Sequence, residues 1–122
     1  MTLPLSPEML EAAYEYLRTT PPFSRWNMPE GEDVKFTVAS FRRLEFGRYQ
    51  WDGKQHTINM SAKAIGYSGT LLEKMAHEMI HLHLEETGME SRRGDTDTHN
   101  AAFRKFAAQV CKTHGFDPKA FY

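Results

Sequence analysis

The chain has 122 residues, of which 40% are hydrophobic, 25% charged and 12% aromatic, as expected for a single globular domain spanning residues 1–122. Fifteen basic and sixteen acidic residues give a net charge of −1, which argues against a strongly basic nucleic-acid-binding or membrane-surface protein. The single cysteine excludes an internal disulfide and a cysteine-based zinc ribbon. The sequence shows no signal peptide and no apolar run of membrane-spanning length, and together these features predict a cytoplasmic protein.

A helix is predicted close to the amino terminus. Ser6 is a capping residue, Pro7 suits the first helical position, and Glu8 follows at the positive end of the helix dipole. Apolar residues then recur at helical spacing until Pro21-Pro22 ends the segment. Residues 23–33 contain two further helix breakers and are predicted to form a loop.

Three strands are predicted next. Residues 34–38 alternate apolar and polar side chains, residues 44–51 form a second candidate strand, and residues 55–61 (QHTINMS) a third. Asp52-Gly53 between the last two favours a tight hairpin turn. Together they predict a small three-stranded antiparallel sheet.

Two helices are predicted after the sheet. The first covers residues 70–87, with a capping box of Thr70 and Glu73 at its start and Gly88 as its left-handed end. The second covers about residues 98–114 and ends at Gly115. The predicted fold is therefore α+β: a helix, an antiparallel sheet, a central helix and a carboxyl-terminal helix.

The central helix contains the sequence His77-Glu78-x-x-His81. Histidines four residues apart lie on one helix face, so their imidazoles can bind one ion, and Glu78 lies beside that face within reach of a water on the ion. By composition alone the pattern arises by chance in a few per cent of such chains, so an ordinary polar helix face is the alternative. Its position in a well-capped central helix favours a metal site, because such a site needs rigid support.

A third ligand has to come from elsewhere in the chain. Glu85 lies about 12 Å along the helix from His77, too far to share one ion, and His83 points away, towards the surface or an outer shell. His99 is the best candidate because it opens the last helix and can swing against the central one. Two acids just before it are possible substitutes or orienting carboxylates: Asp95 and Asp97. The remaining histidines, His56 and His114, lie in the third strand and near the end of the last helix.

The sequence resembles the SprT-like family, which includes the Spartan proteases. The resemblance covers roughly residues 8–116 and depends on three stretches: HTINMSAKAI, LLEKMAHEMIHLHL and THNAAFRKFAAQV. It implies a minimal zincin fold with zinc bound by His77, His81 and His99. It also implies Glu78 as the catalytic acidic residue and peptide hydrolysis as the activity.

Two other functions compete with a zinc metallopeptidase that acts on protein or peptide substrates. The first is a non-catalytic zinc-binding domain that docks on nucleic acid or on a protein. The second is a nucleic-acid-binding module, suggested by interleaved basic and aromatic residues at Arg25-Trp26, Arg42-Arg43, residues 48–51 and Arg92-Arg93. Because the chain is nearly neutral, we expect nucleic-acid contact to be weak or indirect, and we expect no membrane contact.

Overall fold

The computed structural model describes residues 5–39, 46–90 and 99–122. Its elements run in the order α1 (Pro7–Arg18), β1 (Val34–Ala39), β2 (Gly47–Trp51), β3 (His56–Ser61), α2 (Ser68–Glu86), α3 (Ala101–His114) and α4 (Pro118–Phe121), with two short 3-10 turns, Phe23–Arg25 and Gly31–Asp33, ahead of β1. The α+β class and the predicted first, central and carboxyl-terminal helices are confirmed. The short helix α4 was not predicted.

The sheet is mixed, so the prediction of an antiparallel sheet is wrong. The strand order is β1-β3-β2: β3 pairs antiparallel with β2 and parallel with β1, where Val34 lies opposite His56 and Ala39 opposite Ser61. The β2–β3 hairpin forms as predicted, and Asp52 accepts hydrogen bonds from the backbone N–H groups of Lys54 and Gln55 in its turn. In the sheet β3, not β2, lies against β1, and the β1–β3 pair is parallel.

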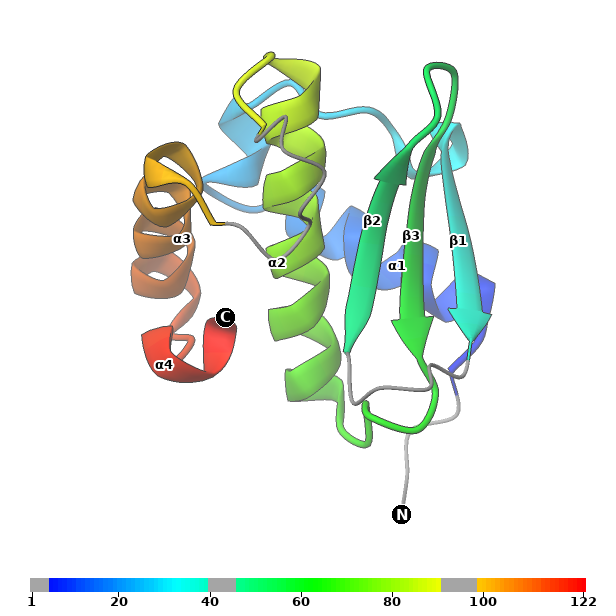
Figure 1. Ribbon diagram of the computed structural model, residues 1–122. Helices are drawn as coiled ribbons and strands as arrows, with labels where there is room; N and C mark the ends of the chain where they lie inside the picture. Colours follow the sequence, from blue (N-terminus) through cyan, green and yellow to red (C-terminus); the bar gives the residue numbers. More distant parts are fainter. Residues whose placement is uncertain (1–4, 40–45, 91–98) are drawn as a thin grey trace.

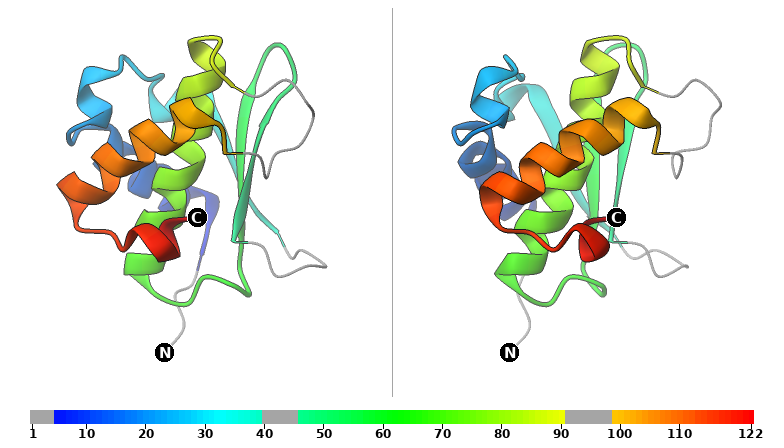
Figure 2. Two further views of the ribbon diagram at one scale, coloured as in Figure 1. Left: turned by 60° about the vertical axis from the view of Figure 1, so that its left-hand side comes forward. Right: turned by 90° about the vertical axis from the view of Figure 1, so that its left-hand side faces the viewer.

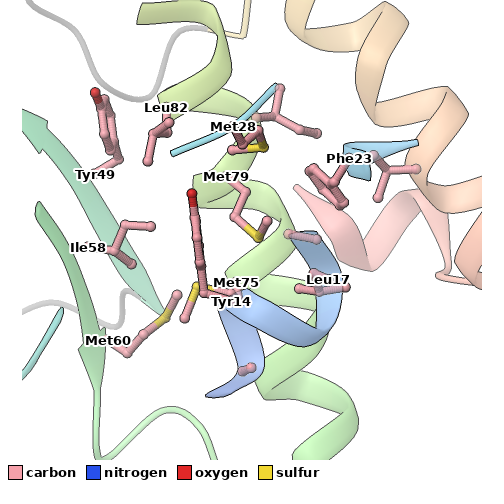
Figure 3. Close-up of a cluster of buried hydrophobic side chains, with 14 of the residues drawn as sticks. Tyr14, Leu17, Phe23, Met28, Tyr49, Ile58, Met60, Met75, Met79 and Leu82 are labelled. Atoms are coloured by element: carbon pink, nitrogen blue, oxygen red, sulfur yellow. The ribbon is translucent and has the colours of Figure 1, made fainter. Parts of the chain in front are cut away.

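One face of the sheet packs on the helices. Along β3 the side chains of Ile58 and Met60 are fully buried, whereas Thr57 and Asn59 between them are only partly buried, which is the alternation of a sheet with one covered face. In Figure 1, α1 lies behind the sheet and α2 runs beside β2. Figure 3 shows side chains from α1, α2, β2 and β3 converging in the core, among them Tyr14, Met75 and Met79.

The central helix begins earlier than predicted. α2 starts at Ser68, and its first turn is closed by a hydrogen bond from the Leu71 N–H to the Tyr67 carbonyl (3.0 Å). Thr70 is therefore inside the helix, and the predicted capping box of Thr70 and Glu73 is wrong: the N-cap is Tyr67, which makes no side-chain capping bond. The predicted end is confirmed, since Gly88 has the left-handed φ of 75°.

The last two helices pack against α2 on the side away from the sheet. Figure 2 shows α3 crossing α2, with α4 and the carboxyl terminus folded back beneath it. Asn100 caps α3 by accepting the Phe103 N–H (2.9 Å), and Gly115 ends it with a φ of 76°, as predicted. In the part of the chain that the structure describes, no helix is long and apolar enough to cross a membrane.

Candidate metal centre

Two histidines of α2 and one from just ahead of α3 meet on the α3 side of α2. His77 and His81 lie one turn apart on α2, and His99 lies just before the cap of α3. One nitrogen of each imidazole can be chosen so that all three lie within 4.8 Å of one another. We call these three residues the histidine cluster. The crossing of α3 over α2 brings His99 to a pair from which it is separated by 18 or more positions in the sequence.

The spacing within the cluster suits a tetrahedral ion. The Nε2 atoms of His77 and His99 are 3.3 Å apart. Two nitrogens bound to zinc at 2.0–2.1 Å, with a tetrahedral angle between them, are separated by about 3.3 Å. The cluster therefore fits a metal cofactor.

The hydrogen bonds of the α2 pair fix which ring nitrogen is free. The Nδ1–H of His77 donates to the Phe121 carbonyl oxygen (3.0 Å), and the Nδ1–H of His81 donates to a carboxylate oxygen of Glu90 (2.8 Å). Both acceptors lack hydrogens, so each Nδ1 carries a proton, and Nε2 is the ring nitrogen that remains available to an ion. This is the tautomer that a metal-binding imidazole needs, and a carbonyl or carboxylate at the other nitrogen commonly holds it.

Burial keeps His77 neutral. The side chain of His77 is 12% exposed and that of His81 is 6% exposed. Desolvation, helped by the neighbouring His81 and His99, lowers the pKa of His77 to about 3, so this imidazole is uncharged at neutral pH. A neutral imidazole keeps the lone pair that a metal requires.

An aromatic ring supports all three imidazoles from one side. Phe103 is fully buried, and its ring centroid lies 4.9 Å from that of His77, 4.6 Å from that of His81 and 4.4 Å from that of His99. An apolar support of this kind limits water access from the α3 side and lowers the local dielectric.

Glu78 lies at the edge of the cluster without being part of it. Its carboxylate oxygen Oε2 is 4.0 Å from His77 Nε2, and the residue is 6% exposed. A carboxylate at this distance is close enough to reach a water bound beside the imidazoles, which is the position that a general base needs.

The other histidines lie away from the cluster. His56 donates from Nε2 to Glu86 (2.6 Å) and accepts at Nδ1 from the Tyr49 hydroxyl (2.6 Å). His114 lies 3.2 Å from the Thr20 hydroxyl. The prediction for His83 is wrong, because its side chain is buried and stacks on Trp26 (ring centroids 4.4 Å apart).

Three contributors to the site were missed by sequence reasoning: Glu90, Phe103 and the carbonyl of Phe121. Phe103 follows His99 by only four residues, so its closeness in the sequence was an available signal. The other two come from segments with no fixed spacing to the motif. The candidate substitutes Asp95 and Asp97 lie outside the described residues.

The basic-aromatic stretches are only partly on the surface. Trp26 packs between Phe23 and Phe106, and Tyr49 is buried with its hydroxyl bonded to His56, so two of the aromatic side chains belong to the interior. Trp51 is 41% exposed. The pairs Arg42-Arg43 and Arg92-Arg93 lie outside the described residues.

Glu90 offers a test of the cluster that leaves its three imidazoles in place. Replacing Glu90 by glutamine weakens the acceptor for the His81 Nδ1–H, and the affinity for zinc should fall by roughly 10–100-fold, as is typical for such outer partners. Glu86→Gln is the matched control, because it alters another glutamate–histidine pair, at His56 (2.6 Å against 2.8 Å), away from the cluster. Competition titration with a fluorescent zinc chelator measures the zinc affinity of both variants. If Glu90→Gln binds zinc as tightly as Glu86→Gln, Glu90 does not orient His81.

The comparison with known families gives one match. The SprT-like family matches residues 10–120, which is nearly the whole chain. No individual curated protein matches the sequence.

Proposed function

Because the chain belongs to the SprT-like family, a domain related to zincin-like metallopeptidases, we propose that it is a zinc-dependent metallopeptidase that hydrolyses peptide bonds in proteins or peptides. The observation that carries this proposal is the convergence of His77, His81 and His99 with Glu78 at the edge of the cluster. A purely structural zinc site is normally closed by a fourth protein ligand and has no use for a base.

The residues of the cluster have distinct roles in this proposal. His77, His81 and His99 would hold the ion through their imidazoles, which are the nitrogen ligands that zinc accepts. When bound, zinc supplies Lewis-acid chemistry that polarises the scissile carbonyl and makes a water nucleophilic at neutral pH. Glu78 accepts a proton from the attacking water and delivers it to the leaving amine.

The edge strand β2 is the proposed binding surface for the substrate backbone. Among the described residues it pairs with β3 alone, and in Figure 1 it is the strand nearest to α2, which carries the histidine pair. An extended peptide added to this edge binds through main-chain hydrogen bonds, so recognition depends little on sequence.

The test measures zinc content and cleavage in one sample. The zinc-loaded chain should contain one zinc per molecule and cleave an unfolded protein such as casein, because both ion and base are then present. EDTA should stop cleavage and added zinc should restore it. A sample that holds its zinc and cleaves nothing would favour the non-catalytic zinc-binding domain instead.

A further inference from the structure

A pocket lies between α3 and the segment that contains α4. Its volume is about 320 Å³, within the range of pockets that take small molecules. Ala107, Ala108 and Cys111 line it from α3, and Phe116 and Tyr122 line it from the opposite side. These side chains are apolar or aromatic, so the body of a ligand that fits here is apolar.

Two cations complete the lining of this α3–α4 pocket. Arg104 and Lys112 both border it and are both exposed to solvent. Arg104 already donates to the His99 carbonyl oxygen (2.5 Å), whereas Lys112 has no hydrogen-bond or ion-pair partner among the described residues. An unpartnered ammonium is a compact point charge, and it can pair with one oxygen of a small anionic group such as a carboxylate.

The surrounding charge favours an anion as well. Residues 99–122 contain four basic residues and one acidic residue, although the whole chain has a net charge of −1. The single acid, Asp117, uses its carboxylate to cap α4 by accepting the Lys119 N–H (2.9 Å). Residues 99–122 therefore carry a net positive charge, although the carboxylates of Glu73 and Asp117 both act on Cys111 in the pocket.

We propose that the α3–α4 pocket binds a small apolar carboxylate, with its apolar body on Ala108 and Cys111 and its carboxylate at Lys112. The burial of apolar surface supplies the affinity and the lysine selects the charged end. Two sources offer this chemistry: a free carboxylic acid, or the carboxyl-terminal residue of a peptide. The pocket also adjoins the metal centre, because Arg104 bonds to the His99 carbonyl and the Tyr122 ring lies 5.0 Å from the His99 ring.

The probe is 3-phenylpropionate, titrated into the isotope-labelled chain and followed by NMR. Saturable shifts are expected at the backbone amides of Ala108 and Cys111, and the neutral amide of the same acid should bind at least five-fold more weakly. Lys112→Gln should reduce acid binding to the level of that amide, whereas Lys105→Gln, which changes an exposed lysine outside the pocket, should not.

Filling the pocket is the second arm of the test. Ala108→Trp should abolish the saturable shifts, and Gln109→Trp, at the neighbouring exposed position outside the pocket, should leave them unchanged. A peptide with a free carboxyl-terminal phenylalanine is then added to the probe complex, alongside its amidated form. Displacement of the probe by the free peptide only identifies a peptide carboxyl terminus as the ligand, and failure to displace it identifies a free acid. The proposal is overturned if the acid gives no saturable shift, or if acid and amide bind equally. The readout is binding, so its outcome is independent of peptidase activity.

Discussion

Replacing Glu78 by glutamine should lower the rate of peptide hydrolysis by roughly 10²–10⁴-fold, which corresponds to about 3–5 kcal/mol of lost transition-state stabilisation. The amide cannot accept the proton of the attacking water, yet it has nearly the same size as the carboxylate. The fold and the zinc content should therefore be unchanged, because Glu78 is not one of the three residues of the histidine cluster. The measurement is cleavage of an unfolded protein by matched, zinc-quantified samples.

Glu85→Gln is the control for this experiment. It removes a carboxylate from the same helix but from a position outside the histidine cluster. This variant should retain cleavage close to that of the unmodified chain. If Glu78→Gln cleaves as fast as the unmodified chain, Glu78 is not the base and the proposed mechanism is wrong.

Replacing His99 by alanine should weaken zinc binding by at least about 100-fold, because a ligand is lost and not merely an outer partner, whose loss costs roughly 10–100-fold. An ion held by the histidine cluster would connect α2 with the start of α3, so its binding would also stabilise the folded state. At a zinc concentration of 100 times Kd this stabilisation is about 2.7 kcal/mol. The melting temperature of the unmodified chain should therefore rise with zinc, and that of His99→Ala should not rise in the same concentration range.

His114→Asn is the matched control, since it changes a histidine near the other end of α3 that is not in the cluster. It should keep both the zinc affinity and the zinc-dependent rise in melting temperature. Undiminished zinc affinity in His99→Ala would instead assign the third ligand to another residue, with Asp95 and Asp97 as the first to replace.

The parts of the fold that depend on neighbouring residues were predictable. Ser6 and Pro7 mark the start of α1, and Gly88 and Gly115 mark the ends of α2 and α3, because capping and left-handed backbone involve only a few adjacent positions. Asp117-Pro118 carries the same kind of start signal as Ser6-Pro7, so α4 was also within reach of the sequence.

The order of the strands in the sheet was not predictable from neighbouring residues in this way. Alternating side chains identify strands and the Asp52-Gly53 turn identifies a hairpin, but neither says which hairpin strand lies against β1. In the structure the more buried strand β3 takes the centre, and β2, which carries the exposed Arg48 and Gln50, takes the edge. Charged edge strands are common because they resist unwanted pairing, and this feature of β2 was an available but unused signal.

The candidate site also has a part that the sequence predicts and a part that depends on the tertiary structure. His77, Glu78 and His81 share one helical turn, so the sequence alone places them together and indicates their chemistry. The approach of His99 and the Phe121 carbonyl at His77 depend on how α3 and α4 fold back over α2, whereas the carboxylate of Glu90 reaches His81 from the segment just after α2. These contacts join residues that are 9 to 44 positions apart, and only the folded arrangement of the segments determines which of them meet.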